Sequence, residues 1–188
     1  MPARATATLA AGQAVAVTVD GLGGAGKTTL LALLKKKLGT RAVMTHEPGG
    51  APRAEKIRAI LKRGVGPQPD PLTDFFLFWS ARAEHVHKKI MPALRKGKIV
   101  VSDRFDSSTY AMQVVGEGRN DFKKLFWQCR AQMVKDVAPD LYIILDAPLS
   151  IVRARKRGRK RGEDRFDDRA ESYQKRVGEG YRAFARAI

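Results

Sequence analysis

Short, continuous apolar runs alternate along the chain with longer segments in which apolar residues recur at every third or fourth position. A short continuous run rich in Val and Ile is typical of a strand that is buried on both faces of a parallel sheet. Four such runs predict strands at residues 14–19, 41–45, 98–102 and 141–146.

The longer segments predict helices, because a spacing of three or four residues places apolar side chains on one helix face. The clearest segment covers residues 71–95, in which Pro92 is expected to kink or restart the helix. Its apolar face is expected to comprise Leu72, Phe75, Phe76, Trp79, Ala83 and Val86. Other helices are expected at residues 27–38, 53–63, 107–115, 121–135, from 148 onward, and at 167–187.

This alternation predicts an α/β fold with a mostly parallel sheet flanked by helices. A length of 188 residues suits one domain, residues 1–188, in which residues 1–12 are expected to be a disordered terminus. The sequence contains no long apolar run, so no membrane span is expected. Its single cysteine, Cys129, excludes a disulfide framework and favours a cytoplasmic protein.

The first predicted strand leads into the sequence GLGGAGKT at residues 21–28, which has the form of a phosphate-binding loop and precedes a helix-forming run. Glycines let backbone N–H groups approach a polyphosphate closely, and the helix N-terminus adds its positive dipole end. Lys27 is expected to reach the β- and γ-phosphates, and the Thr28 hydroxyl to bind Mg²⁺. The alternative is an ordinary glycine-rich turn. The nucleotide-binding positions expected here are Gly21, Gly24, Gly26, Lys27, Thr28 and Thr29.

A second candidate group follows the third predicted strand, where Asp103 and Arg104 are adjacent. An Asp at a strand end can hold Mg²⁺, and an Arg can clamp a phosphate through two N–H groups. A purely structural Asp–Arg pair is the alternative. Because ligands of parallel sheets bind at the carboxyl ends of the strands, these residues are expected on the same side as the phosphate loop.

The chain is strongly basic, with 36 Lys and Arg residues against 19 Asp and Glu and a net charge of +17. The densest basic cluster covers residues 153–161. It is consistent with a solvated surface, with a lid that closes on phosphates, or with a nucleic-acid-binding patch.

Five stretches, in order over residues 14–184, make the chain resemble the bacterial thymidylate (dTMP) kinases. They are VDG before the loop, THEPGG at 45–50 with AEKIR at 54–58, FWSAR at 78–82, SDRFDSST at 102–109, and PD at 139–140 before Asp146. The resemblance implies a three-layer P-loop NTPase fold, a homodimer, and Mg²⁺-dependent phosphoryl transfer from ATP to dTMP.

The resemblance also implies residue roles. Phe78 would stack on the thymine ring, although a plain core role is its alternative, and Arg82 would hydrogen-bond the base from the same helix face. Arg58 and Arg104 would hold the acceptor phosphate, while Glu47 would support the site. The implied substrate-binding residues are Glu47, Arg58, Phe78, Arg82, Arg104, Thr109 and Gln113.

By the same resemblance, the basic segment becomes a lid over residues 153–166 that closes on ATP. Phosphoryl transfer depends on positioning and electrostatics, so no general base is assigned. The implied catalytic residues are Lys27, Asp103, Arg104, Arg155, Arg161 and Arg165, and the implied metal ligands are Thr28 and Asp103.

The chain departs from the family pattern at Gly23, where relatives carry a carboxylate, at His46, where they carry Arg, and at Met112, where they carry Tyr. Relatives also continue beyond the position of Ile188, so the expected sheet has four to five strands. Two alternatives therefore stay open. One is a kinase for another (deoxy)pyrimidine monophosphate, and the other is a catalytically weak relative that binds nucleic acid.

Overall fold

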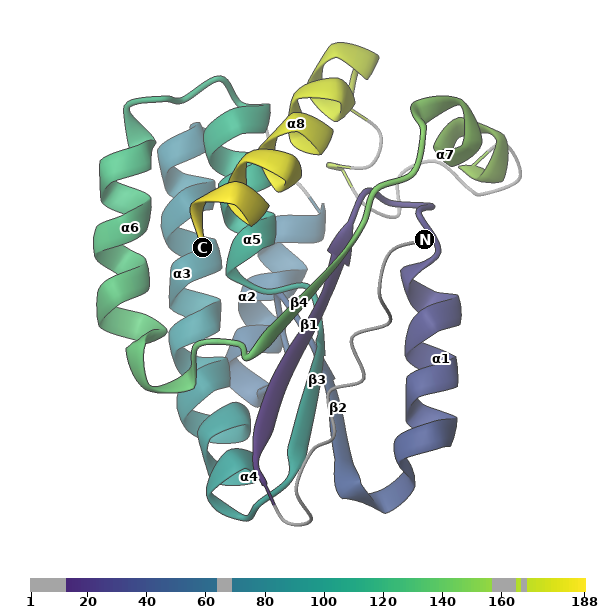
Figure 1. Ribbon diagram of the computed structural model, residues 1–188. Helices are drawn as coiled ribbons and strands as arrows, with labels where there is room; N and C mark the ends of the chain where they lie inside the picture. Colours follow the sequence, from purple (N-terminus) through teal and green to yellow (C-terminus); the bar gives the residue numbers. More distant parts are fainter. Residues whose placement is uncertain (1–12, 64–68, 157–164, 167–168) are drawn as a thin grey trace.

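Four parallel strands form one sheet at the centre of the protein (Figure 1). The computed structural model describes residues 13–63, 69–156, 165–166 and 169–188. The strands are β1 (Val15–Gly21), β2 (Ala42–His46), β3 (Ile99–Asp103) and β4 (Leu141–Leu145), in the spatial order β2-β3-β1-β4. All three pairings are parallel, which confirms the four predicted strands and the α/β class.

Helices cover both faces of the sheet and make three layers, as expected. Figure 1 shows α1 (Lys27–Leu38) on one face and α2 (Pro52–Arg63), α3 (Pro71–His85), α6 (Phe122–Met133) and α8 (Glu171–Ala187) on the other. The shorter helices are α4 (Met91–Arg95), α5 (Asp106–Thr109) and α7 (Leu149–Lys156), with 3₁₀ turns at Gly39–Arg41 and Lys135–Val137. In the part of the chain that the structure describes, no helix is long and apolar enough to cross a membrane.

The predicted helix over residues 71–95 is continuous but irregular. A π-helical stretch, Val86–Ile90, separates α3 from α4, and Met91 N–H bonds the carbonyl of Val86. Pro92 has no N–H to donate, so the irregular hydrogen bonding falls where the proline was expected to disturb the helix. A second π-helical stretch, η3 (Tyr110–Gly116), continues α5 in the same way.

The buried face of α3 differs from the predicted one. Phe75 and Trp79 are buried, but Leu72 and Phe76 are 38% and 45% exposed. The buried face of α3 instead includes polar side chains, among them Arg82 and His85. A search for apolar spacing misses such residues because it treats charge as a sign of exposure.

Burial of β4 is also less complete than expected. This strand pairs only with β1, and Leu141 at its start is 51% exposed. An edge strand is covered on fewer sides than a central one, whereas Val19 and Val101 in the middle of the sheet are fully buried. The last helix begins at Glu171 rather than at 167. Arg161, most of the predicted lid and residues 1–12 lie outside the described residues.

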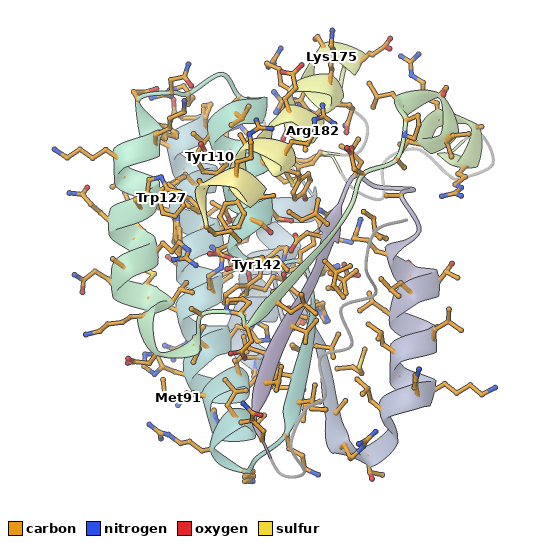
Figure 2. All side chains as sticks on the ribbon, viewed as in Figure 1. Met91, Tyr110, Trp127, Tyr142, Lys175 and Arg182 are labelled. Atoms are coloured by element: carbon orange, nitrogen blue, oxygen red, sulfur yellow. The ribbon has the colours of Figure 1, made fainter. Side chains whose placement is uncertain are left out.

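Aromatic rings anchor α8 to the rest of the protein (Figure 2). The ring centroid of Phe184 in α8 lies 5.8 Å from that of Tyr110, 6.1 Å from Trp127 and 5.2 Å from Tyr142. Such pairs stabilise a core beyond the area they bury. As a result α8, the last element of the chain, is fixed beside α5 and the sheet, where its Tyr181 reaches the phosphate loop.

The close packing of α8 on η3 depends on Gly180. A Cβ atom at Gly180 would lie 2.7 Å from the Ala111 Cα atom and 3.0 Å from the Ala111 carbonyl oxygen. Both atoms belong to the backbone, so the two helices would have to separate. At Gly178 the nearest atoms to such a Cβ are side-chain atoms of Arg182 and Leu22 at 3.9 Å.

We therefore expect Gly180→Ala to lower the free energy of unfolding by about 1–3 kcal/mol, as overpacking does. The control, Gly178→Ala, should be neutral or stabilising by up to about 1 kcal/mol, because Ala is the better helix former. Urea unfolding monitored by circular dichroism measures both. If the two variants change stability in the same direction, close helix packing is not the reason for Gly180.

Candidate active site

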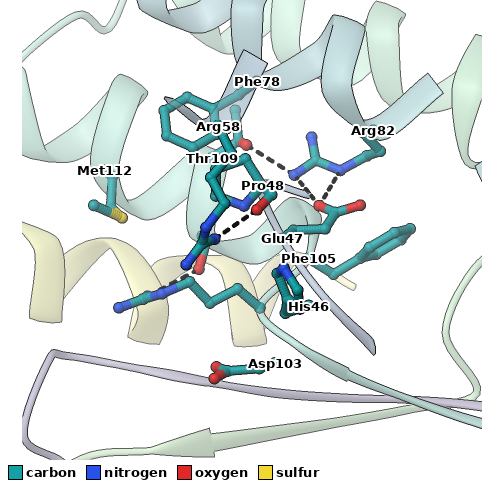
Figure 3. Close-up of a pocket in the computed structure, with 12 residues that line it drawn as sticks. His46, Glu47, Pro48, Arg58, Phe78, Arg82, Asp103, Phe105, Thr109 and Met112 are labelled. Atoms are coloured by element: carbon teal, nitrogen blue, oxygen red, sulfur yellow. Dashed lines mark hydrogen bonds and ion pairs between the residues drawn. The ribbon is translucent and has the colours of Figure 1, made fainter. Parts of the chain in front are cut away.

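The carboxyl ends of β1, β2 and β3 meet at one edge of the sheet, as the sequence predicts. A pocket opens there between these ends, α3 and α5 (Figure 3). It is lined by His46, Glu47, Pro48, Arg58, Phe78, Arg82, Asp103, Arg104, Phe105, Ser108, Thr109 and Met112.

The phosphate loop connects β1 to α1 with the geometry that its glycines permit. Gly21, Gly24 and Gly26 all have positive φ, at 129°, 90° and 111°. At Gly21 a Cβ would lie 2.5 Å from the carbonyl oxygen of Leu145, so no other residue fits between β1 and β4. Thr28 and Thr29 are exposed in the first turn of α1, where backbone N–H groups attract an anion.

Two basic side chains lie against the carbonyl oxygens of this loop. The Nζ of Lys27 donates to the carbonyls of Gly21 and Leu22, at 3.0 and 2.9 Å. The Nη1 of Arg155, in α7, donates to the carbonyls of Gly24 and Ala25, at 3.2 and 3.3 Å. The first residues of the predicted lid therefore already contact the loop, which places their positive charge where phosphates would bind.

Two carboxylates, the buried Asp20 and the partly buried Asp103, lie beside the loop at neighbouring positions of the sheet. Asp103 pairs in register with Val19, the residue before Asp20. Among the described residues, Asp103 Oδ1 and Asp20 Oδ2 are buried without a hydrogen-bond partner. Buried carboxylate oxygens are nearly always satisfied, and Mg²⁺ takes oxygen ligands from one or two carboxylates together with phosphates and water. These residues and the Thr28 hydroxyl fit that ion, and the sequence analysis gave Asp20 no role.

Arg104 joins the loop to α5 and α8. Its backbone has φ 72°, which is rare for a residue other than glycine. Its Nη1 donates to the carbonyl of Gly21, to the Ser108 hydroxyl and to the Tyr181 hydroxyl, at 3.2, 3.2 and 2.9 Å. Burial raises the pKa of Tyr181 to about 12 although Arg104 lowers it, so the phenol stays protonated at neutral pH.

Ser108 completes this arrangement. Its hydroxyl donates to Asp20 Oδ1 at 2.6 Å and lies 2.8 Å from the Tyr181 oxygen. Since a carboxylate only accepts, the protonated Tyr181 is the donor to Ser108. Tyr181 and Ser108 were not identified from the sequence; no local motif could show that Tyr181, 77 residues from Arg104, bonds to it.

On the other side of the pocket a buried ion pair joins β2 to α3 (Figure 3). The Glu47 Oε2 atom accepts from Arg82 Nε at 2.9 Å, and Arg82 Nη2 donates to Thr109 Oγ1 at 3.0 Å. Arg82 also stacks over Trp79, with its guanidinium carbon 4.5 Å from the ring centroid. Its Nη1 is buried without a partner among the described residues. Arg82 and Phe78 both line the pocket, so a side chain in the pocket wall has one unused hydrogen-bond donor among the described residues.

The turn after β2 follows from its two glycines. Gly49 and Gly50 have φ 129° and 80°, and the Glu47–Pro48 peptide bond is cis. The Nη1 of Arg58 donates to the carbonyl of Pro48 at 2.5 Å, which places Arg58 at the pocket rim. His46 bonds Glu55 at 2.8 Å. Burial raises the pKa of Glu55, but the Gly50 N–H and His46 outweigh it, and the net pKa lies below its usual value.

Two of the predicted site residues lie elsewhere. The side chain of Gln113 is 1% exposed in η3 and does not line the pocket. Arg165 donates to the carbonyl of Leu61 at 2.6 Å and to Asp74 at 2.5 Å, both in the α2–α3 layer.

Met112 and His46, two of the residues that depart from the family pattern, do line the pocket. A cluster of three or more His, Cys, Asp or Glu side chains suited to a metal ion is absent from the described residues.

Comparison with known proteins gives one consistent family. The sequence model of the thymidylate kinase family matches residues 19–187. A thymidylate kinase from Alkalilimnicola ehrlichii is 41% identical over 172 residues, which are 90% of this chain and 78% of the relative. One from Chlamydia caviae is 38% identical over 91% of this chain and 84% of its own length.

The fold agrees with this match. A crystal structure of thymidylate kinase from Ehrlichia chaffeensis has a TM-score of 0.73 and 30% sequence identity, and the likeness covers 93% of this chain and 85% of that chain. The match to the family model extends from the phosphate loop through α8. The chain therefore belongs to the thymidylate kinase family.

Proposed function

We propose that this protein transfers the γ-phosphoryl group of ATP to dTMP, in the presence of Mg²⁺, and releases ADP and dTDP. The observation that carries the proposal is the pocket beside the phosphate loop, in which Arg82 Nη1 is a buried donor without a partner among the described residues. A carbonyl oxygen of a pyrimidine base would accept from it. Family membership supports the same substrate.

Each side of the pocket has a part in this reaction. Phe78 would stack on the base and Arg82 would fix its orientation, while Arg104 and Arg58 hold the acceptor phosphate. Lys27 and the loop N–H groups would hold the phosphates of ATP, and Arg155 would add positive charge at the same loop. Asp103, Asp20 and Thr28 would hold Mg²⁺, which neutralises phosphate charge when bound.

Catalysis of this kind needs alignment rather than a base. The link from Gly21 through Arg104 to Ser108 ties the donor loop to the acceptor side. The transferring group would therefore meet fixed positive charges on both sides, which is the main source of rate in phosphoryl transfer. The roles of Arg161, Arg165 and Gln113 stay predictions.

The deciding assay measures ADP release with ATP and Mg²⁺ and each nucleoside monophosphate in turn. We expect turnover with dTMP and much less with purine monophosphates, because one Arg82 donor and a narrow stacking site suit a single pyrimidine ring. A preference for another pyrimidine monophosphate would agree with Met112 in the pocket and would replace dTMP as the substrate. Salt-dependent DNA binding without any turnover would contradict a kinase altogether.

A second experiment tests Arg82 directly. Arg82→Lys keeps one positive charge for Glu47 but removes the planar fork that serves Glu47, Thr109 and the base together. We expect KM for dTMP to rise about tenfold or more, with KM for ATP unchanged, since one hydrogen bond to a charged group is lost. Steady-state kinetics with each substrate varied in turn measure both constants.

The matched control is Arg130→Lys. Arg130 donates to Asp106 at 2.7 Å, an ion pair of similar kind whose members do not line the pocket. It should leave both KM values unchanged even where it lowers stability. If Arg82→Lys raises the two KM values equally, Arg82 supports the fold rather than the acceptor.

We further propose a homodimer in the reducing cytoplasm, formed through the exposed apolar face of α3. Leu72 and Phe76 lie on this helix, 38% and 45% exposed, next to the buried face that forms the core. Exposed apolar side chains grouped on one helix favour association. Light scattering after gel filtration should give about twice the chain mass, and Phe76→Glu should give monomer. A monomeric wild-type protein would exclude the dimer.

A further inference from the structure

We infer that His85 is the positioning residue for the acceptor base. By fixing the Glu47 carboxylate, it holds the guanidinium of Arg82 in one orientation in the wall of the pocket. The inference rests on the proposed binding of a pyrimidine monophosphate for its kinetic test, but its structural part stands on contacts within the protein.

His85 lies in the last turn of α3 and is 0% exposed. Both ring nitrogens contact β2 or the residue that follows it. Nδ1 lies 3.0 Å from Glu47 Oε1, and Nε2 lies 2.6 Å from Thr45 Oγ1. Its ring thus bridges alternate residues of one strand end and ties them to the helix that carries Phe78 and Arg82.

The partners determine where the ring carries its proton. An ionised carboxylate only accepts hydrogen bonds, so Nδ1 must be the donor to Glu47. The Thr45 hydroxyl can donate to Nε2, which makes a neutral ring with its proton on Nδ1 sufficient for both contacts. With that tautomer, Arg82 supplies the positive charge that faces Glu47.

The consequence for Arg82 is geometric. Since His85 occupies Oε1 of Glu47, Arg82 shares only Oε2, through Nε at 2.9 Å and Nη2 at 2.8 Å. Nη2 also reaches Thr109 at 3.0 Å, which fixes the plane of the guanidinium. Nη1 is thereby kept off the carboxylate. If Oε1 lost its donor, the Glu47 carboxylate would be free to turn, and the orientation of the Arg82 guanidinium would no longer be fixed.

The backbone of the turn is fitted closely around this ring. A Cβ at Gly50 would lie 2.4 Å from His85 Nε2 and 2.6 Å from Thr45 Oγ1. Gly50, with φ 80°, is therefore required next to the histidine as well as by its own conformation. A buried histidine that merely filled the core would not need two polar partners on the strand that supplies Glu47.

Two amide substitutions separate the contacts. The side-chain nitrogen of Asn stands as many bonds from Cβ as Nδ1 does, whereas that of Gln stands as many bonds away as Nε2. His85→Asn therefore keeps a donor for Glu47 and loses the Thr45 contact, and His85→Gln does the reverse. The controls are His87→Asn and His87→Gln, the same changes at an exposed histidine two residues later.

We expect His85→Gln to raise KM for dTMP about tenfold to a hundredfold with KM for ATP unchanged, and His85→Asn to stay within about threefold of the wild type. The His87 variants should not change either constant. Equal losses in the two His85 variants, or parallel changes in both KM values, would overturn the inference, because a packing role does not distinguish Asn from Gln in this order.

Nitrogen NMR of the unliganded wild-type protein supplies a test that needs neither activity nor a variant. His85 should show a protonated Nδ1 and an unprotonated Nε2 at neutral pH. The opposite tautomer would leave Glu47 without its donor and would overturn the inference even if the protein phosphorylates dTMP. If the tautomer is as expected but the protein phosphorylates no monophosphate, the proposed function is wrong, while the role of His85 in positioning Glu47 still holds.

Discussion

The ion pair between Glu47 and Arg82 is the interaction on which the acceptor side of the site depends. Both side chains are almost completely buried, with 4% and 1% exposed. A buried charge is tolerated only with its partner, and removing one member of such a pair costs about 3–5 kcal/mol. The pair therefore forces the end of β2, the last turn of α3 and Thr109 of α5 into one arrangement. The pocket exists where these three elements meet.

A second network, made of hydrogen bonds, fixes the phosphate loop to the same elements. Asp20, Ser108 and Tyr181 form a chain of hydrogen bonds from the end of β1 to α8, and Arg104 joins this chain to Gly21 of the phosphate loop. Neither set of contacts alone would fix the distance between a donor and an acceptor phosphate. Thr109 and Ser108 both lie in α5, so this helix takes part in both networks. It therefore fixes the position of the Glu47–Arg82 pair relative to the phosphate loop.

Much of this arrangement was predictable from local sequence, and the reason is physical. Strand runs and the phosphate loop are defined by neighbouring residues, so the four strands, α1 and the position of Asp103 followed directly. Contacts between residues that are far apart in the sequence leave no local pattern. Tyr181 and His85 were therefore not identified from the sequence. Arg165, which was expected in a lid, bonds Asp74 in α3. The exposed Phe76 shows the same limit, since apolar spacing gives a helix but not the face that its neighbours cover.

Some buried polar atoms at the site have no hydrogen-bond partner among the described residues. Trp79 and Gln113 show that some such atoms lie in the core among the described residues, so their presence alone does not define a site. At the site, however, they have opposite chemistry: carboxylate oxygens of Asp20 in β1 and Asp103 at the end of β3, and the Nη1 donor of Arg82, which lines the pocket together with Phe78. In the proposed reaction, a nucleotide with a cation at its phosphates and an acceptor oxygen on its base would give partners to both groups of atoms, so these atoms, and not the loop alone, would contribute to the choice of substrate.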